Sequence, residues 1–245
     1  MTPATEVPEG AIVRRGFGIA DLLTFPARHD EAPALPRRAD VIRGRQFQIL
    51  RLWAGFGIVG YLPPELRRAG EDDHDVIVGL IDAAAQWLRA TKDTDQWTQP
   101  WRSEEDRSNR IRRDLTAGKT WLLHDSGLAV ATITADPEDY PIWPAEQQRE
   151  PAVYVRRLVV RRDHAGRRLG TTLLDWAGLR AREAYGAKWI RVDVWRTNKE
   201  LHNYYEDQGF RSCGECRDPA YPSGALFQKP TDQLKEPLPP LFHEA

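Results

Sequence analysis

The stretch VVRRDHAGRRLGTTLL, residues 159–174, decides how this chain of 245 residues is organised. It begins as an apolar strand end, continues as a short loop that contains four arginines, and ends as the start of an amphipathic helix. Such an order aims the unpaired N–H groups and the positive end of the helix at one point in space. We therefore predict an anion site at this loop, and a diphosphate is the guest that fits it.

The segments downstream continue an alternation of strands and helices. The helix after the loop carries apolar residues at spacings of three and four, and the segment 189–195 alternates apolar with polar residues, which predicts a strand with one buried face. Residues 199–208 predict a short helix that Gly209 ends, and the segments 210–216 and 225–228 predict a final hairpin.

The segments upstream predict a first strand at 47–52, an irregular connection at 55–70 and a helix that begins at Asp75. Ser103 has the pattern of a helix N-cap, so a second helix is expected to about Thr116. The segments 120–123 and 128–134 predict a hairpin, and 153–160 predicts a strand. The fold class is therefore mixed α/β, with a mostly antiparallel sheet and one βαβ unit that carries the anion loop.

The composition divides the chain into three parts. Residues 1–45 are rich in Pro, Gly, Ala and charge, which predicts a flexible or partner-binding extension. Residues 46–231 hold the predicted elements and form one domain, and residues 232–245 form a tail. The prolines of the tail favour a surface segment without regular structure after Pro230.

Charge and hydropathy exclude several classes of function. With 35 basic and 36 acidic residues the net charge is −1, which argues against a dedicated nucleic-acid binder. There is no apolar run of 18 residues and no signal-peptide pattern, so we expect no membrane partner and a cytoplasmic location. The only two cysteines, Cys213 and Cys216, lack the second ligand pair of a zinc site, so no metal is expected.

The order of elements, the strand end at 158–160, the loop HAGRRLGTTLL and the segment NKELHNYYEDQGF (198–210) together resemble the GNAT superfamily of N-acetyltransferases. The resemblance covers about residues 46–230. The family's cofactor loop has the pattern Q/R-x-x-G-x-G/A, whereas this chain has Ala165 at the first position and Arg168 at the central glycine.

The resemblance implies acetyl-CoA as co-substrate. It implies that backbone groups of the strand end pair with the pantetheine arm and that the loop backbone holds the pyrophosphate, with the arginines adding contacts to phosphate. The cofactor-binding residues expected on this basis are Leu158, Val159, Val160, Gly166, Arg167, Arg168, Leu169, Gly170, Thr171 and Asn198.

The resemblance also implies a catalytic Tyr205, four residues before Gly209, as the acid that protonates the leaving thiolate. Tyr204 lies about 100° round the helix from it and is expected to pack in the core. Many family members carry a glutamate on the strand before the loop, but this chain has Tyr154, Arg156 and Arg157 there. Asp193 is the first candidate for a base, and Asp136, Glu138 and Asp139 are alternatives.

The acceptor pocket of the family lies between the first two helices and the last hairpin. The corresponding regions of this chain offer Asp95, Trp97, Asp136 and Tyr221 as substrate-binding residues. Carboxylates beside aromatic faces favour a cationic amine, whether a small molecule or a peptide. A core role for the tryptophan and solvated loop acids are equally compatible with the pattern.

These residues predict an N-acetyltransferase that moves an acetyl group from acetyl-CoA to a primary amine by direct attack in a ternary complex. The departures at Ala165 and Arg168 and the missing glutamate motivate one alternative, an acyl-CoA-binding regulatory or interaction module with weak turnover. The oligomeric state is left open by the sequence, a homodimer included.

Overall fold

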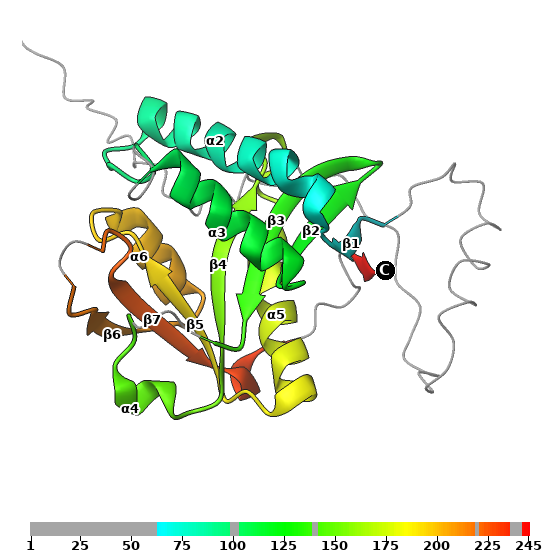
Figure 1. The fold of residues 1–245 in the computed structure, drawn as a ribbon. Coiled ribbons are helices and arrows are strands. Elements are labelled where there is room, and N and C mark those ends of the chain that lie inside the picture. The colour runs from blue at the N-terminus through cyan, green and yellow to red at the C-terminus, as the bar shows by residue number, and fades with distance from the viewer. Residues whose placement is uncertain (1–62, 99–102, 139–141, 219–220, 236–241) are drawn as a thin grey trace, which may run out of the picture.

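The computed structural model describes residues 63–98, 103–138, 142–218, 221–235 and 242–245. In chain order its regular elements are β1 (Glu65–Arg68), η3 (Glu71–Asp73), α2 (His74–Thr91), α3 (Glu104–Thr116), β2 (Thr120–Asp125), β3 (Leu128–Asp136), α4 (Ala145–Gln148), β4 (Ala152–Val160), η4 (Arg162–His164), α5 (Leu169–Tyr185), β5 (Trp189–Val194), α6 (Lys199–Asp207), β6 (Arg211–Glu215), β7 (Ala225–Pro230), η5 (Thr231–Gln233) and β8 (His243–Glu244). The longer helices lie on a sheet that runs through the domain (Figure 1).

Within the described ranges, eight strands form one sheet in the order β6-β7-β5-β4-β3-β2-β1-β8. The β4–β5 and β1–β8 pairs are parallel, and the other neighbours are antiparallel. Helix α5 connects the parallel strands β4 and β5, which makes the predicted βαβ unit. The predicted mixed α/β fold with a mostly antiparallel sheet is confirmed.

The helices cover both faces of the sheet, and strand β2 shows how. Leu122 belongs to the core cluster beneath α2 and α3, whereas its neighbours Trp121 and Leu123 belong to the cluster that includes α5. Successive side chains of a strand point to opposite faces, so each face has its own helices. Figure 1 shows α2 and α3 side by side across one of these faces. The sheet therefore separates two core clusters, one on each face.

Local sequence explains the two helices on the first face. In α2 the buried residues include Ile77, Leu80, Ile81 and Leu88, spaced so that they form one apolar stripe. Burial of each such side chain stabilises the fold by about 1.5–3 kcal/mol. In α3 the hydroxyl of Ser103 accepts a hydrogen bond from the N–H of Asp106 at 3.1 Å, so the predicted N-cap is confirmed.

The predictions for the ends of the domain need correction. Residues 65–68 form strand β1, where the sequence predicted an irregular connection at 55–70. Only one residue of this strand, Leu66, is apolar and fully buried, so the segment is too short to show an alternating pattern. The strand predicted at 47–52 and the extension 1–45 lie outside the described residues.

The tail is more ordered than its prolines predict. After Pro230 it forms the short helix η5 and strand β8, which pairs with β1. Leu234 is buried against α5, where a Cβ on Gly178 would lie 2.2 Å from its Cδ1 atom. Because a glycine leaves room for this leucine, the tail docks on the helix. The prediction of a tail without regular structure is wrong for these residues.

The site is positioned by the divergence of β4 and β5. The two strands pair from Ala152↔Trp189 to Val155↔Val192, although β4 continues to Val160 and β5 to Val194. Arg157 has φ +49°, and the register of β4 against β3 shifts at this place. A bulge of this kind bends a strand. It therefore coincides with the point at which β4 separates from β5.

Candidate active site

A cavity of about 460 Å³ lies at the opening between β4 and β5. One wall is the end of β4, residues 155–160, and another is the end of β5 with Asp193 and Trp195. Helices α2, α3 and α6 and the segment that precedes β7 complete the lining. The cavity thus connects the start of α5 with the middle of the sheet.

The strand end at 158–160 has the backbone arrangement that the sequence predicts for a cofactor site. Leu158, Val159 and Val160 all line the cavity. On the β3 side Val159 and Val160 pair with Thr132 and Ala131, but the ladder to β5 has already ended at Val155. Backbone groups on the β5 side are thus available to an extended ligand that adds to the strand.

The loop before α5 turns through two left-handed residues, Gly166 at φ +81° and Arg168 at φ +58°. Arg168 is the N-cap of α5, and its side chain makes no capping hydrogen bond. The first amides of the helix, from Leu169 to Thr171, therefore point past the N-terminus without an intrahelical partner. A left-handed central residue also explains why a glycine is favoured there. Such a backbone suits the anion that the sequence predicts at this loop, and Gly170 lines the cavity.

The arginines of the loop differ in what they contact. Arg167 donates from Nη1 to Oδ2 of Asp125 at 2.6 Å, and Arg161 forms an ion pair with Asp163 at 2.7 Å. The Arg161 contact is the main cause that holds the pKa of Asp163 well below its usual range. Arg168 is exposed beside the helix N-terminus. Of these three, Arg168 is thus the arginine best placed to meet a phosphate at the cradle.

Sequence reasoning missed a stacked pair beside this loop. The guanidinium of Arg162 lies over the ring of Trp87, with its carbon 3.9 Å from the ring centroid. Trp87 and its neighbours Leu88 and Arg89 on α2 line the cavity. The pair links the loop to α2, where Trp87 is half-buried against the core.

Asn198 lies at the start of α6, and both polar atoms of its side-chain amide form hydrogen bonds within the protein. Its Oδ1 atom accepts from the N–H of Leu201 at 2.9 Å, as a helix N-cap. Its Nδ2 atom donates to Oε1 of Gln96 at 2.6 Å. Asn198 is buried and does not line the cavity, whereas Gln96 does. Its side chain therefore positions the 92–98 loop and α6 rather than reaching into the cavity.

The two tyrosines of α6 both line the cavity. Among the described residues no group forms a hydrogen bond with the Tyr205 hydroxyl, and burial raises the pKa of this phenol far above its usual value. The Tyr204 hydroxyl lies 3.3 Å from Oγ1 of Thr171, and burial raises the pKa of Tyr204 to about 12. Tyr204 packs in the core as predicted, but it also borders the cofactor loop. Both phenols are therefore protonated donors at neutral pH.

Asp193 lies on β5 at the cavity wall. Its Oδ2 atom accepts from the hydroxyl of Ser223 at 2.8 Å. Burial is the main cause that raises the pKa of Asp193, and the bond from Ser223 and the charges of Arg156 and Arg157 oppose it. A carboxylate with a raised pKa is a better proton acceptor than a solvated one. Ser223 was missed because it lies 30 residues away in a loop without a motif.

Two of the four residues predicted for the acceptor line the cavity, and two do not. Trp97 and Tyr221 are part of its lining. Asp95 is exposed and accepts from Nε1 of Trp195 at 2.8 Å, and Asp136 is buried between Lys119 and Arg156 at 2.9 and 2.6 Å. Neither carboxylate borders the cavity, whose acidic lining residues are instead Asp82, Glu104 and Asp193. Asp139, one of the alternatives for the base, lies outside the described residues.

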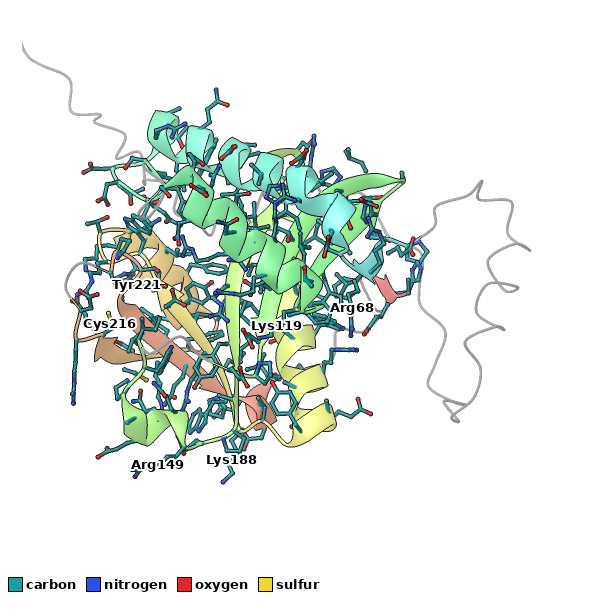
Figure 2. All side chains as sticks on the ribbon, in the orientation of Figure 1. Arg68, Lys119, Arg149, Lys188, Cys216 and Tyr221 are labelled. Atoms are coloured by element: carbon teal, nitrogen blue, oxygen red, sulfur yellow. The ribbon has the colours of Figure 1, made fainter. Side chains whose placement is uncertain are left out.

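Tyr221 is held on the cavity wall by the segment between β6 and β7. Arg196 donates to the backbone oxygens of Tyr221 and Asp218 at 3.1 and 2.9 Å, and to Sγ of Cys216 at 3.2 Å. Tyr221 and Cys216 lie near each other in this segment (Figure 2). Both cysteines are free thiols. In the part of the chain that the structure covers there is no cluster of His, Cys, Asp and Glu suited to a metal ion.

Comparison with known proteins agrees with this geometry. Residues 81–210 match the profile described as the acetyltransferase (GNAT) family. A protein of Bacillus subtilis (strain 168), named uncharacterized N-acetyltransferase YesJ, is 29% identical over an alignment of 149 residues, and the match covers 58% of this chain and 79% of the relative. No helix among the described residues is long and apolar enough to cross a membrane.

Solved structures share the fold. A GNAT-family acetyltransferase of Listeria monocytogenes 4b F2365 superposes with a TM-score of 0.54 at 22% identity, covering 71% of this chain and 96% of that one. The PaiA N-acetyltransferase of Thermoplasma acidophilum, in complex with coenzyme A, has a TM-score of 0.53 at 15% identity, with 69% and 99% covered. The family match spans more than half of the chain and includes the cofactor loop, the end of β4 and α6. The chain therefore belongs to the acetyltransferase (GNAT) family.

Proposed function

We propose that this acetyltransferase uses acetyl-CoA and transfers the acetyl group to a primary amine by direct attack in a ternary complex. The observation that carries the proposal is the single cavity that joins the open backbone of β4 and the start of α5 to Tyr205 and Asp193. Acetyl-CoA needs an anion cradle, an unpaired strand edge and a donor near its sulfur. The described residues offer a candidate for each of the three around this cavity, which supports the proposal.

The thioester of acetyl-CoA supplies an activated acyl carbon when it is bound. Amides of residues 169–171 would hold the pyrophosphate, and backbone groups of Leu158 to Val160 would align the pantetheine arm. A backbone N–H at this strand end would also polarise the acetyl carbonyl. Because β4 has a bulge and separates from β5, the backbone groups on the β5 side of Leu158 to Val160 are unpaired before the cofactor binds. Little reorganisation of the protein is therefore needed on binding.

Proton transfers would be shared between two side chains. Asp193 accepts a proton from the attacking amine, directly or through one water molecule, as the C–N bond forms. Tyr205 donates to the sulfur as the C–S bond breaks. Because its pKa is raised, Tyr205 stays protonated across the pH range in which an amine can attack. A hydrogen bond from Tyr205 then stabilises the negative charge that develops on the sulfur.

The test is release of free thiol from acetyl-CoA in the presence of a panel of primary amines, with thermal unfolding followed in parallel. We expect acetyl-CoA to raise the melting temperature and at least one amine class to release thiol. Stabilisation by acetyl-CoA without thiol release from any amine would instead support a binding module with little turnover. Absence of both signals would contradict the proposed use of acetyl-CoA.

A further inference from the structure

The segment between β6 and β7 brings two side chains to the cavity. Tyr221 and Ser223 both line it, and the Ser223 hydroxyl donates to Oδ2 of Asp193 at 2.8 Å. The described residues between Glu215, where β6 ends, and Ala225, where β7 begins, belong to no helix or strand. The position of this segment at Asp193 therefore depends on contacts outside regular secondary structure.

Many of these contacts come from one side chain, that of Arg196, which follows β5. Its guanidinium donates to the backbone oxygens of Cys216, Asp218 and Tyr221 at 3.2, 2.9 and 3.1 Å. It also donates to the Cys216 thiol at 3.2 Å and forms an ion pair with the carboxylate of Glu215. One guanidinium thus holds the segment at several points along its length.

The far end of the segment closes over this guanidinium. The backbone N–H of Arg196 donates to the carbonyl oxygen of Pro222 at 3.0 Å, and the N–H of Cys216 donates to that of Gly224 at 2.8 Å. A Cβ on Gly224 would lie 2.3 Å from Nη2 of Arg196. The missing side chain of the glycine leaves room for the guanidinium. Arg196 is therefore enclosed by the segment that it holds.

Ser223 is the contact through which this segment acts on Asp193. Burial raises the pKa of Asp193, and the bond from Ser223 opposes this rise because it stabilises the carboxylate. The other charged and titratable groups around Asp193 are Arg156 and Arg157 of β4, Tyr205 of α6 and Tyr221 of the segment itself, with Arg110 of α3 near Arg157 and Tyr221. Loss of the Ser223 bond alone would leave these groups in place, and Asp193 would then release its proton at a higher pH.

We propose that Arg196 is a positioning residue of the acetyl transfer, which fixes residues 221–223 so that the Ser223 hydroxyl stays on Asp193. This assignment rests on the proposed N-acetyltransferase function, in which Asp193 is the base. A guanidinium suits the task, because its donors lie in one rigid plane and reach several carbonyl oxygens at once.

The first experiment measures thiol release against pH for Arg196→Gln, for Ser223→Ala and for the double variant. We expect each single variant to lower kcat/KM about 10-fold more on the acid side of the profile than on the alkaline side, because Asp193 loses its proton at a higher pH. The double variant should shift the profile no further than Ser223→Ala alone, since both changes remove the same bond. An unshifted profile in either single variant, or additive shifts in the double variant, would overturn the positioning role.

Arg217→Gln is the matched control, because Arg217 is exposed on the same segment and does not line the cavity. Its pH profile should follow that of the wild type. Thermal unfolding shows whether each variant folds. If Arg196→Gln does not fold, Gly224→Ala replaces it, because the added methyl group displaces the guanidinium and keeps its charge. The same shift of the profile is expected for Gly224→Ala, and its absence would overturn the proposal.

The second experiment separates this inference from the proposed function. The isotope-labelled carboxyl carbon of Asp193 is titrated by NMR in the same variants without any substrate, and Asp193→Asn identifies its signal. We expect the midpoint to move to higher pH in Arg196→Gln and Ser223→Ala, and to stay unchanged in Arg217→Gln. An unchanged midpoint in Arg196→Gln would overturn the positioning role even where thiol release is normal. No thiol release by the wild type with any amine would overturn the acetyl transfer itself, whatever the titration shows.

Discussion

Strands β4 and β5 are paired along their first half and separate along their second half. In the first half, from Ala152↔Trp189 to Val155↔Val192, the strands are paired and the side chains are packed. In the second half the strands separate and their ends line the cavity. The paired half has ladder hydrogen bonds between the two strands, whereas the open half lacks them, although Val159 and Val194 are still buried in the core. The contrast teaches that a strand end can stay unpaired when the well-packed part of the same strand pair lies directly beside it.

The largest effect is expected in the paired half, at Arg191. Its side chain is fully buried, with bonds to Gln228, to the Gln147 carbonyl, to the Tyr154 hydroxyl and to Glu150, at 2.6–3.2 Å. Arg191→Ala would leave these acceptors without their donor and create a cavity. We expect a loss of about 3–5 kcal/mol in the free energy of unfolding, measured with denaturant.

The exposed Arg149, on the segment that Arg191 holds, is the control for this change. Arg149→Ala should alter the free energy of unfolding by less than about 0.5 kcal/mol. If Arg191→Ala cost no more than this control, the paired half would not be the stabilising partner of the comparison.

The next effect belongs to the open half and concerns rate instead of stability. Tyr205→Phe should lower kcat about 1,000-fold, because the sulfur loses its donor. Its unfolding free energy should stay within about 1 kcal/mol of the wild type, since the ring and its contacts with Phe210 and Phe227 remain. Tyr204→Phe, which removes only the contact with Thr171, should cost less than about 10-fold. The reverse order of the two variants would transfer the donor role to Tyr204.

Deprotonation of Asp193 should raise the reaction rate and lower the stability of the fold. Its pKa is raised in the folded state, so the native protein holds the proton more tightly and stability falls as pH rises from the usual aspartate pKa through the raised one. Over the same range the wild-type rate should rise as the base loses its proton. Asp193→Asn should remove this rise, lower kcat/KM about 100-fold and increase the unfolding free energy at neutral pH. An unchanged pH–rate profile would exclude Asp193 as the base.

The smallest effect is expected at the cofactor loop. Arg168 has a left-handed conformation that costs an L-residue about 1 kcal/mol. Arg168→Gly should relieve this cost and raise the unfolding free energy by about 0.5–1 kcal/mol, whereas Arg168→Ala should not. Both variants lack the charge, so both should bind acetyl-CoA a few-fold more weakly by calorimetry. Tighter binding of acetyl-CoA by either variant would show that the charge of Arg168 does not stabilise the bound phosphate.

Local patterns predicted the elements around residues 159–174 better than the contacts of Asn198 and Asp95. The strand, loop and helix around residues 159–174 are adjacent in sequence, so periodicity and two glycines were enough to place them. Asn198 differs, because its partner Gln96 lies 102 residues away and could not be foreseen. The same holds for Asp95, whose hydrogen bond with Trp195 spans 100 residues.

Asp136 shows why sequence alone was insufficient. The sequence predicts it as a substrate-binding acid, but it is buried in ion pairs with Lys119 and Arg156 and does not line the cavity. Whether a charged residue faces a cavity depends on long-range pairing, which a single sequence does not contain. The short strands β1 and β8 were not predicted for a related reason. They are stabilised by pairing, of β1 with β2 and of β8 with β1, and not by a local sequence pattern.

Backbone hydrogen exchange with and without acetyl-CoA tests the central claim most directly, namely that the open half of the β4–β5 pair is the cofactor edge. We predict that acetyl-CoA slows exchange at the amides of residues 158–160 and 166–171, and leaves residues 189–192 of the paired half unchanged. Binding of acetyl-CoA without protection at 158–160 and 166–171 would contradict the account.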